Sequence, residues 1–441
     1  MRRGILVLCA DVVGRRMAGA GIRASELARV LAEDNEVTLL AAAVDGDASA
    51  EVKCAVATRS NVAAAVTAAD AIVVQGSALH LLDKVDTKRT PVAVDLYDLN
   101  VVEDLEIHST AAASERIDRA RNAAAILADQ ARRGDFFVVA SERQRDFVLG
   151  ALGAHGRLNP LTYDSDRDLR RLVAVVPFGI TAGTPKAGGL RGRVPGIAAN
   201  DKIAVWGGGL WNWFDPITLV RATERLAPDH ATLRAVFLGS GHPNPSVPRM
   251  RAEIETRRAA EAAGLIGTHV FFMEGWLPYA ERGARLADAD VGVSLHLPGI
   301  ETHFAFRTRV LDYLWAGLPM LLTSGDVLAA EAAASGFGVI VEPRDVAAVS
   351  DGLRRLLEDD ALAASCRRAA QVAAERYRWP TVAAPLRQFC REPRLARDRG
   401  LAQDQSPART RIVRRAWSAL RDDGPVRFGR RTVRYLRRRF L

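Results

Sequence analysis

The feature that most constrains the fold is an alternation of two segment types. Short apolar segments typical of strands alternate with amphipathic segments typical of helices almost throughout the 441 residues. The first, residues 4–10, is a continuous apolar run of the kind that lies in a sheet covered on both faces. Residues 22–33 then place Leu27, Val30 and Leu31 on one face of a helix. Such alternation predicts parallel sheets with helices on both faces.

The alternation occurs in two series. In the first half, strands are expected at residues 4–10, 36–44, 70–75, 91–96, 135–140 and 172–176. In the second half, they are expected at residues 203–206, 233–238, 269–273, 290–295, 319–323 and 338–341. Each series spans about 170–180 residues, the size of one domain. We therefore predict an α/β protein of two doubly wound, parallel-sheet (Rossmann-like) domains, residues 1–180 and 201–375, joined by a linker at 181–200.

Composition excludes several other classes. With 49% hydrophobic and 26% charged residues, the chain is neither disordered nor collagen-like. No apolar run reaches about 18 residues, so no membrane-spanning helix is expected. Asp11 ends the N-terminal apolar run too early for a signal peptide, and the four cysteines lack zinc-ligand spacing. These features predict a cytoplasmic protein without a disulfide framework.

The positive charge is concentrated at the C-terminal end. Residues 391–441 hold 16 Arg and 5 acidic residues, whereas 45 basic and 47 acidic residues nearly cancel in residues 1–390. A nucleic-acid-binding domain would carry its charge on the folded body, so no nucleic-acid partner is expected. Apolar residues such as Trp417, Leu420 and Phe440 interrupt the arginines. The segment is therefore either an amphipathic tail that binds an anionic membrane surface or a solvated basic tail.

Glycines follow the first strand in the pattern Gly14-x4-Gly19-x-Gly21. A helix begins next, and its free N–H groups and partial positive charge favour an anion, which the glycines would let approach. The alternative is a tight turn without a ligand. The spacing is not Gly-x-Gly-x-x-Gly, and no ribose-binding acid follows about 20 residues on, so a dehydrogenase is disfavoured.

A second glycine loop occupies the same place in the second half. Residues 206–216 read WGGGLWNWFDP, directly after a predicted strand. Gly208 and Gly209 suit the close approach of a phosphate or a sugar. The three tryptophans, Trp211 among them, are difficult to explain by core packing alone, although packing is the alternative interpretation.

A third constellation begins at Glu301 and places Arg307 and Arg309 at the start of a helix. It follows a strand, so it lies at the carboxyl edge of the predicted sheet, where doubly wound folds bind ligands. Two arginines there oppose the helix dipole, and an anionic ligand would compensate for that cost. Each Arg–phosphate bond contributes about 1.5–3 kcal/mol. The alternative is a surface pair between Arg309 and Asp312, which are three residues apart.

In combination, these motifs resemble the nucleotide-sugar-dependent glycosyltransferases of family four, which have the two-domain GT-B fold. Residues 311–319 (LDYLWAGLP) resemble that family's Glu-Ala-Met-Ala-x-Gly-x-Pro segment. Gly19 and Gly21 resemble its N-terminal glycine loop, and residues 176–180 (VPFGI) its Pro-x-Gly segment. Residues 377–380 (YRWP) resemble the start of its closing helix. The resemblance implies two domains that face each other across a cleft, with residues 376–390 returning to the first domain.

Other segments resemble a bacterial subgroup tied to cell-surface polysaccharide synthesis. They are residues 207–216, residues 95–98 (DLYD) and residues 141–146 (SERQRD). The chain also departs from the family pattern. Phe304 and Asp312 stand where the family has a Glu-x7-Glu pair, and Glu301 is interpreted as a shifted replacement for the first glutamate.

The resemblance assigns the donor to the second domain. The base would lie near Glu274–Trp276 and the ribose on Asp312. The diphosphate would lie on the glycine loops and on Arg307 and Arg309, because residues 207–216 contain no basic side chain. We expect no metal and no cofactor, since a basic pocket can replace a cation. The donor-binding candidates are Gly19, Gly21, Gly208, Gly209, Trp211, Glu274, Glu301, Arg307, Arg309 and Asp312.

The acceptor would bind the first domain, where a polar group receives its proton. Asp98 and His108 are the catalytic candidates, with Asp95 and Glu103 as further ones; for each, a purely structural role is the alternative. Members of the family retain anomeric configuration. The expectation is a glycosyltransferase that moves a sugar from a nucleotide-diphosphate donor to a glycan or lipid-linked acceptor, peripherally at the inner face of the plasma membrane. The rivals are a nucleotide-sugar 2-epimerase and a non-catalytic nucleic-acid-binding protein that acts through its tail.

Overall fold

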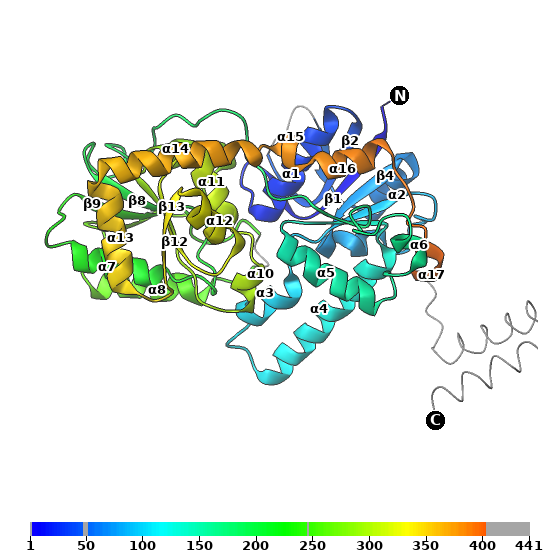
Figure 1. Cartoon of the computed structure of the whole chain (residues 1–441), viewed down its shortest axis with the longest axis horizontal. Helices are drawn as coiled ribbons and strands as arrows, with labels where there is room; N and C mark the ends of the chain where they lie inside the picture. Colours follow the sequence, from blue (N-terminus) through cyan, green and yellow to red (C-terminus); the bar gives the residue numbers. More distant parts are fainter. Residues whose placement is uncertain (1, 47–51, 245–246, 403–441) are drawn as a thin grey trace, which may run out of the picture.

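The computed structural model describes residues 2–46, 52–244 and 247–402, which form two lobes (Figure 1). The first lobe contains a seven-stranded parallel sheet in the order β3-β2-β1-β4-β5-β6-β7. Its strands are β1 (Gly4–Gly14), β2 (Glu36–Asp45), β3 (Lys53–Val56), β4 (Ala71–Gln75), β5 (Val92–Asp95), β6 (Phe136–Val139) and β7 (Val173–Val175).

The second lobe contains a six-stranded parallel sheet in the order β10-β9-β8-β11-β12-β13. Its strands are β8 (Lys202–Trp206), β9 (Leu233–Phe237), β10 (Val270–Phe272), β11 (Val291–Ser294), β12 (Met320–Thr323) and β13 (Gly338–Val341). In both sheets the order reverses beside the first strand of the series. This reversal is the topological switch point at which doubly wound folds bind ligands.

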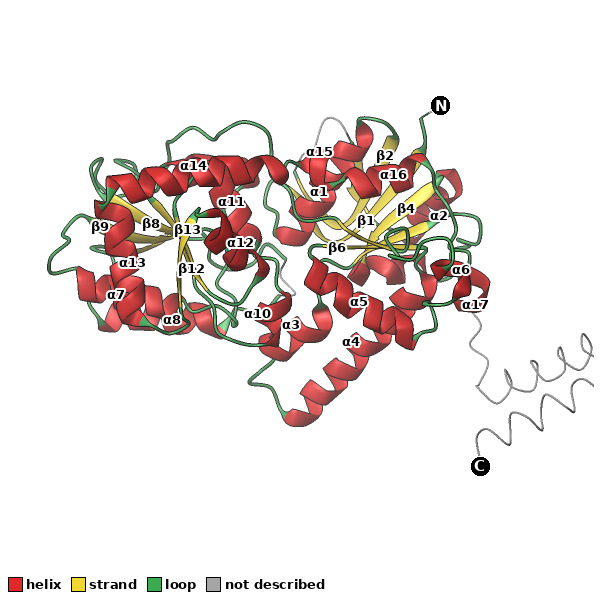
Figure 2. Cartoon of the chain, viewed as in Figure 1, coloured by secondary structure: helices red, strands yellow, loops and turns green. Residues whose placement is uncertain are grey.

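Helices flank both sheets (Figure 2). Those of the first lobe are α1 (Gly19–Ala32), α2 (Arg59–Ala68), α3 (Asn100–Ile107), α4 (Ala113–Arg133), α5 (Glu142–Ala154) and α6 (Pro160–Tyr163), with a 3₁₀ helix η1 (Gly76–Leu82). The second lobe has α7 (Pro216–Leu226), α8 (Arg251–Ala262), η2 (Tyr279–Glu281), α9 (Arg282–Ala287), α10 (Ile300–Phe304), α11 (Thr308–Ala316), α12 (Val327–Ser335), α13 (Val346–Glu358) and α14 (Asp360–Arg376). The last helices are α15 (Trp379–Val382), α16 (Ala384–Arg391) and α17 (Arg399–Ala402).

The predicted α/β class and the two doubly wound sheets are confirmed. Every predicted strand is present, and its ends agree to within one residue except at the end of β1. That strand continues past Asp11 to Gly14, because a register irregularity between Cys9 and Val12 accommodates the polar residue within the strand. The sequence did not indicate β3, which is an edge strand with mostly exposed side chains and therefore lacks a buried apolar pattern.

The chain crosses between the lobes twice, and the two crossings lie side by side. Ile180 pairs with Arg378 in an isolated parallel bridge where the chain leaves and re-enters the first lobe. The adjacent Trp379 is fully buried, and a Cβ on Gly179 would lie 2.4 Å from its ring. Residues 376–390, expected to return to the first lobe, contain α15 and most of α16, and Arg387 of α16 bonds to Asp34 at 2.6 Å.

The packed chain continues beyond α16. Asp398 forms a bidentate ion pair with Arg157 of the first lobe, at 2.8 and 3.1 Å, and both side chains are fully buried. Arg399 bonds to Asp135 at 2.6 Å. Residues 391–402, which composition assigned to the tail, therefore belong to the folded body, while residues 403–441 lie outside the described residues. Within the described part, no helix combines the length and apolarity needed to cross a membrane.

Candidate functional site

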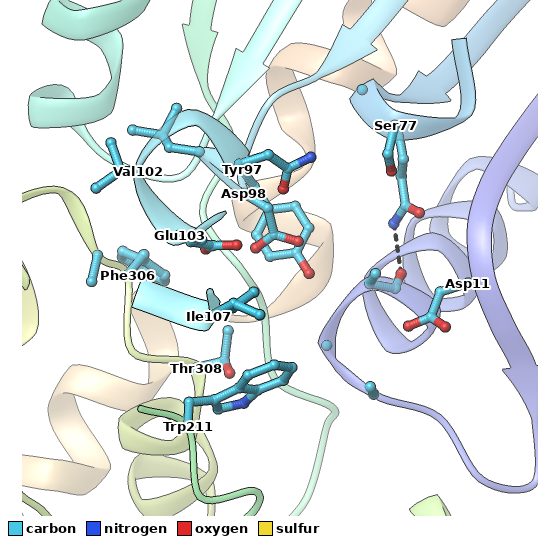
Figure 3. A pocket seen from close by; sticks show the side chains of 18 of the residues that line it. Asp11, Ser77, Tyr97, Asp98, Val102, Glu103, Ile107, Trp211, Phe306 and Thr308 are labelled. Atoms are coloured by element: carbon cyan, nitrogen blue, oxygen red, sulfur yellow. Dashed lines mark hydrogen bonds between the residues drawn. The ribbon is translucent and has the colours of Figure 1, made fainter. Parts of the chain in front are cut away.

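A cavity of about 560 Å³ lies between the lobes, at the carboxyl ends of strands from both sheets. The first lobe contributes residues after β1, β4 and β5, together with α3 and part of α4. The second lobe contributes the glycine loop after β8 and the segment from Glu301 to Asp312. Figure 3 shows Asp98 and Glu103 on one side of this cavity and Trp211 and Thr308 on another. The two halves of the sequence thus form one site.

The second glycine loop forms part of the wall through Gly207, Gly208 and Gly209. Gly208 has a φ of +101°, which favours glycine, and no atom lies within 4 Å of where its Cβ would be. Trp211 lines the cavity and stacks on Trp213, with ring centroids 5.1 Å apart. The loop therefore leaves open backbone beside an aromatic surface.

The first glycine loop divides into two roles. Gly19 begins α1 and lines the cavity. Gly21 does not line it: a Cβ there would lie 2.0 Å from the carbonyl oxygen of Val12, so glycine is required for α1 to pack on β1. Gly14 has a φ of +121° and is enclosed by Asp45. Of the three glycines in the motif, Gly19 alone reaches the cavity.

Arg309 is a buried cation without a carboxylate partner in the described part of the chain. The residue lines the cavity and is 7% exposed. Nη2 donates to the carbonyl oxygen of Gly209 at 2.8 Å, while Nη1 has no hydrogen-bond partner. The guanidinium carbon lies 3.9 Å from the centroid of the Phe214 ring and 4.6 Å from that of Trp206. Burial lowers the pKa of Arg309 to about 10, so it remains charged at neutral pH.

Arg307 also lines the cavity, but its charge is compensated. It donates to both carboxylate oxygens of Glu301, at 2.8 and 2.6 Å, and both residues are buried. Asp326 lies 3.9 Å from Arg307 and accepts a 2.8 Å hydrogen bond from His296. Glu301 and Arg307 were predicted as two donor contacts; the structure joins them in one ion pair.

Asp312 lines the cavity next to a residue that the sequence analysis missed. Nε of Arg282 donates to its carboxylate at 3.1 Å. The Arg282 guanidinium lies over the rings of Tyr279, at 3.7 Å, and Trp315, at 4.6 Å. No motif indicated Arg282, because it stands on a short helix some thirty positions before Asp312.

The first lobe presents acids to the cavity. Burial raises the pKa of Asp98 to about 7; nearby Asp95 and Asp11 raise it further, while a hydrogen bond with Tyr97 and the charge of Arg23 oppose the rise. Burial also raises the pKa of Glu103 well above its usual range, with contributions from Asp98 and Glu301. Asp98 can therefore exchange a proton near neutral pH.

Three other candidates lie differently. Asp95 is buried and forms a bidentate ion pair with Arg23, at 2.6 and 3.0 Å. This pair gives Asp95 a structural role in the core of the first lobe. His108 follows α3 and does not line the cavity. Glu274 also lies outside the cavity; its side chain is 78% exposed and pairs with Arg257 at 3.0 Å. The neighbouring Trp276 lines the cavity and donates to the carbonyl oxygen of Met17 across the lobes.

In the part of the chain that the structure describes, no three His, Cys, Asp or Glu side chains are grouped so that they could hold a metal ion. Arg309 and the glycine loop form a cationic corner, and Asp98 and Glu103 form an acidic one.

The comparisons identify the fold as GT-B. No family model matches the chain, and no curated protein matches its sequence significantly. Among solved structures, sucrose-phosphate synthase (tll1590) from Thermosynechococcus elongatus is 16% identical, with a TM-score of 0.62, and 89% of this chain and 99% of that one are covered. Anabaena Alr3699/HepE in complex with UDP and glucose is 14% identical, with a TM-score of 0.64 and coverages of 88% and 99%. WaaG, described as a glycosyltransferase involved in lipopolysaccharide biosynthesis, is 15% identical, with a TM-score of 0.59 and coverages of 88% and 100%.

Proposed function

We propose that this protein is a glycosyltransferase that uses a nucleotide-diphosphate sugar. The observation that carries the proposal is the uncompensated cation of Arg309 at the wall of the inter-lobe cavity, beside the open backbone of Gly208. A buried charge without a partner is unfavourable, so a site that keeps one is suited to an anionic ligand. A diphosphate matches both the charge and the hydrogen-bond donors of this corner.

In the proposed reaction the bond between the sugar and the diphosphate breaks, and negative charge develops on the leaving diphosphate. Arg309 would stabilise that charge from a fixed position, because Phe214 and Trp206 hold its guanidinium. Because folding already fixes the guanidinium, no further free energy is needed to orient it during the reaction. Arg307 would act indirectly, since its ion pair with Glu301 fixes the chain just before α11.

On the acceptor side, we propose that Asp98 receives the proton of the attacking hydroxyl. Its pKa near 7 allows it to be ionised at neutral pH and still bind a proton readily. On the sequence resemblance, we also propose that the protein belongs to family four and retains anomeric configuration. We further propose that it acts in surface polysaccharide synthesis with a lipid-linked acceptor. Two proteins of the same fold are consistent with this proposal: HepE, whose structure contains UDP and glucose, and WaaG, which is described as involved in lipopolysaccharide biosynthesis. Their support rests on the fold alone.

The test is calorimetric titration with a panel of nucleotide-diphosphate sugars. Arg309→Ala should weaken binding of the preferred donor about ten- to hundredfold, the magnitude of a charge-assisted Arg–phosphate bond. Arg354→Ala is the matched control, because Arg354 lies exposed on α13 in a pair with Asp351. Unchanged affinity in Arg309→Ala would contradict the proposed donor site. Incubating donor without acceptor separates the epimerase alternative, which would convert the donor alone.

A further inference from the structure

The two walls of the cavity differ in the sign of their charges. Among the described residues that line it, every arginine belongs to the second lobe: Arg282, Arg307 and Arg309. The first lobe contributes carboxylates and no Lys, Arg or His; these carboxylates are Asp11, Asp95, Asp98, Glu103 and Asp104. The site is therefore cationic where the donor is proposed to bind and acidic where the acceptor is proposed to bind.

Pairing within the protein sharpens this division. Arg307 is neutralised by Glu301, Arg282 by Asp312, and Asp95 by Arg23. After these pairs, the second-lobe wall retains Arg309, which is more than nine-tenths buried and has Nη1 unpartnered.

The first-lobe wall retains four carboxylates after the same pairing. They are Asp11, Asp98, Glu103 and Asp104. Asp11 accepts a hydrogen bond from Asn244 at 3.0 Å, which supplies no positive charge. Figure 3 shows Asp98 and Glu103 together, and the charge of Asp98 raises the electrostatic cost of ionising Glu103. An anion placed against this wall would meet carboxyl groups and, among the described residues that line it, no cationic side chain.

The rest of the first-lobe wall is neutral. Amide and hydroxyl side chains line it at Gln75, Ser77, Asn100, Asn122 and Gln130. They alternate with apolar side chains of α3 and α4, at Val101, Val102, Ile126 and Leu127. Amides and carboxylates together can both donate to and accept from the hydroxyl groups of a sugar.

We infer that the sugar unit that accepts the transfer carries no negative charge: it is a neutral, hydroxyl-bearing unit, not a sugar phosphate or a uronic acid. This inference rests on the proposed function and names its acceptor class. Like charges brought together in a closed site strongly disfavour binding. The cation that could compensate, Arg309, is occupied by the donor diphosphate in the same complex.

The experiment uses the full chain saturated with the nucleoside diphosphate that binds it most tightly. Binding of matched sugars is then measured by calorimetry or ligand-observed NMR: glucose against glucose 6-phosphate, and methyl glucoside against methyl glucuronide, with the galactose pairs in parallel. We expect the neutral member to bind at least tenfold more tightly. Asp104→Asn should reduce that ratio about three- to tenfold, because it removes one like charge from the first-lobe wall while preserving shape.

Glu106→Gln is the matched control. It makes the same chemical change on the same helix, α3, at a residue outside the cavity wall, and the ratio should not change. Asp11→Asn repeats the test at a second carboxylate of the same wall, should Asp104→Asn fail to fold. Equal or tighter binding of the charged members, no binding of any neutral member, or a ratio unaffected by both variants would overturn the inference. Absence of nucleotide binding at the outset would instead contradict the proposed function.

Discussion

At the scale of single residues, Arg309 illustrates a conflict between stability and ligand binding. Its guanidinium is buried against Phe214 and Trp206 with Nη1 unpartnered. We expect Arg309→Met to raise the free energy of unfolding of the ligand-free protein by about 1–3 kcal/mol, since an apolar chain replaces an incompletely bonded polar group. The same variant should lose donor affinity. Urea denaturation without ligand checks the first effect, and a loss of both properties would indicate a structural role.

The raised pKa of Asp98 predicts how both stability and kcat/KM change with pH. Its folded pKa of about 7 lies above the ordinary 3.8, so its contribution to stability falls as pH rises between these values. If Asp98 accepts the proton, kcat/KM rises with pH and levels off above about 7. Asp98→Asn should lower kcat/KM about 10²–10⁴-fold and remove that rise. A rise that persists in Asp98→Asn would assign it to another acid, with Glu103 the nearest alternative.

The sequence placed Arg307 and Arg309 on equal terms, and the structure distinguishes them. Both stand at the start of α11, where an arginine opposes the helix dipole. Glu301 neutralises Arg307 because the chain between α10 and α11 brings the two side chains together, a contact set by tertiary packing and not by spacing. The residue types of the site could therefore be predicted from the sequence, whereas their pairing could not.

At the scale of elements, the position of α1 depends on a glycine. A Cβ at Gly21 would lie 2.0 Å from the carbonyl oxygen of Val12. Gly21→Ala should therefore destabilise the protein by about 1–3 kcal/mol through overpacking, as measured by urea denaturation. Gly150→Ala is the control: Gly150 is exposed within α5, and no atom lies within 4 Å of its would-be Cβ, so alanine should stabilise by about 0.5–1 kcal/mol. Weakened donor binding with unchanged stability in Gly21→Ala would restore a direct ligand role.

Strands buried on both faces were the most predictable elements. Their apolar runs are nearly continuous, so their ends could be located closely, as in β4 and β12, which are buried throughout. The edge strand β3 left no such pattern, since its residues are mostly exposed. Sequence thus predicts the sheets well where the core determines them and poorly where solvent does.

At the scale of the whole molecule, the packed body extends further along the chain than composition indicates. Asp398 is fully buried against Arg157, so truncation after residue 390 would leave a buried arginine without its carboxylate. We expect this loss to lower the free energy of unfolding by about 3–5 kcal/mol. A membrane experiment should therefore remove residues 403–441, which contain 12 Arg and 3 Asp. We expect the full chain to pellet with anionic vesicles, residues 1–402 not to, and both to melt at similar temperatures. Equal pelleting would contradict a membrane role for the tail.

The two adjacent chain passages at Ile180 and Arg378 also determine how the lobes can separate. Trp379 holds the two chain passages together by packing against Gly179. Near α3 the lobes are joined instead by hydrogen bonds, such as those from Asn212 to the carbonyl oxygens of Glu106 and Ile107. Figure 1 shows α15 and α3 at opposite sides of the junction. If the lobes move apart, this arrangement makes Trp379 the pivot and the α3 edge the opening, and the proposed donor would enter there while the two backbone crossings stay together.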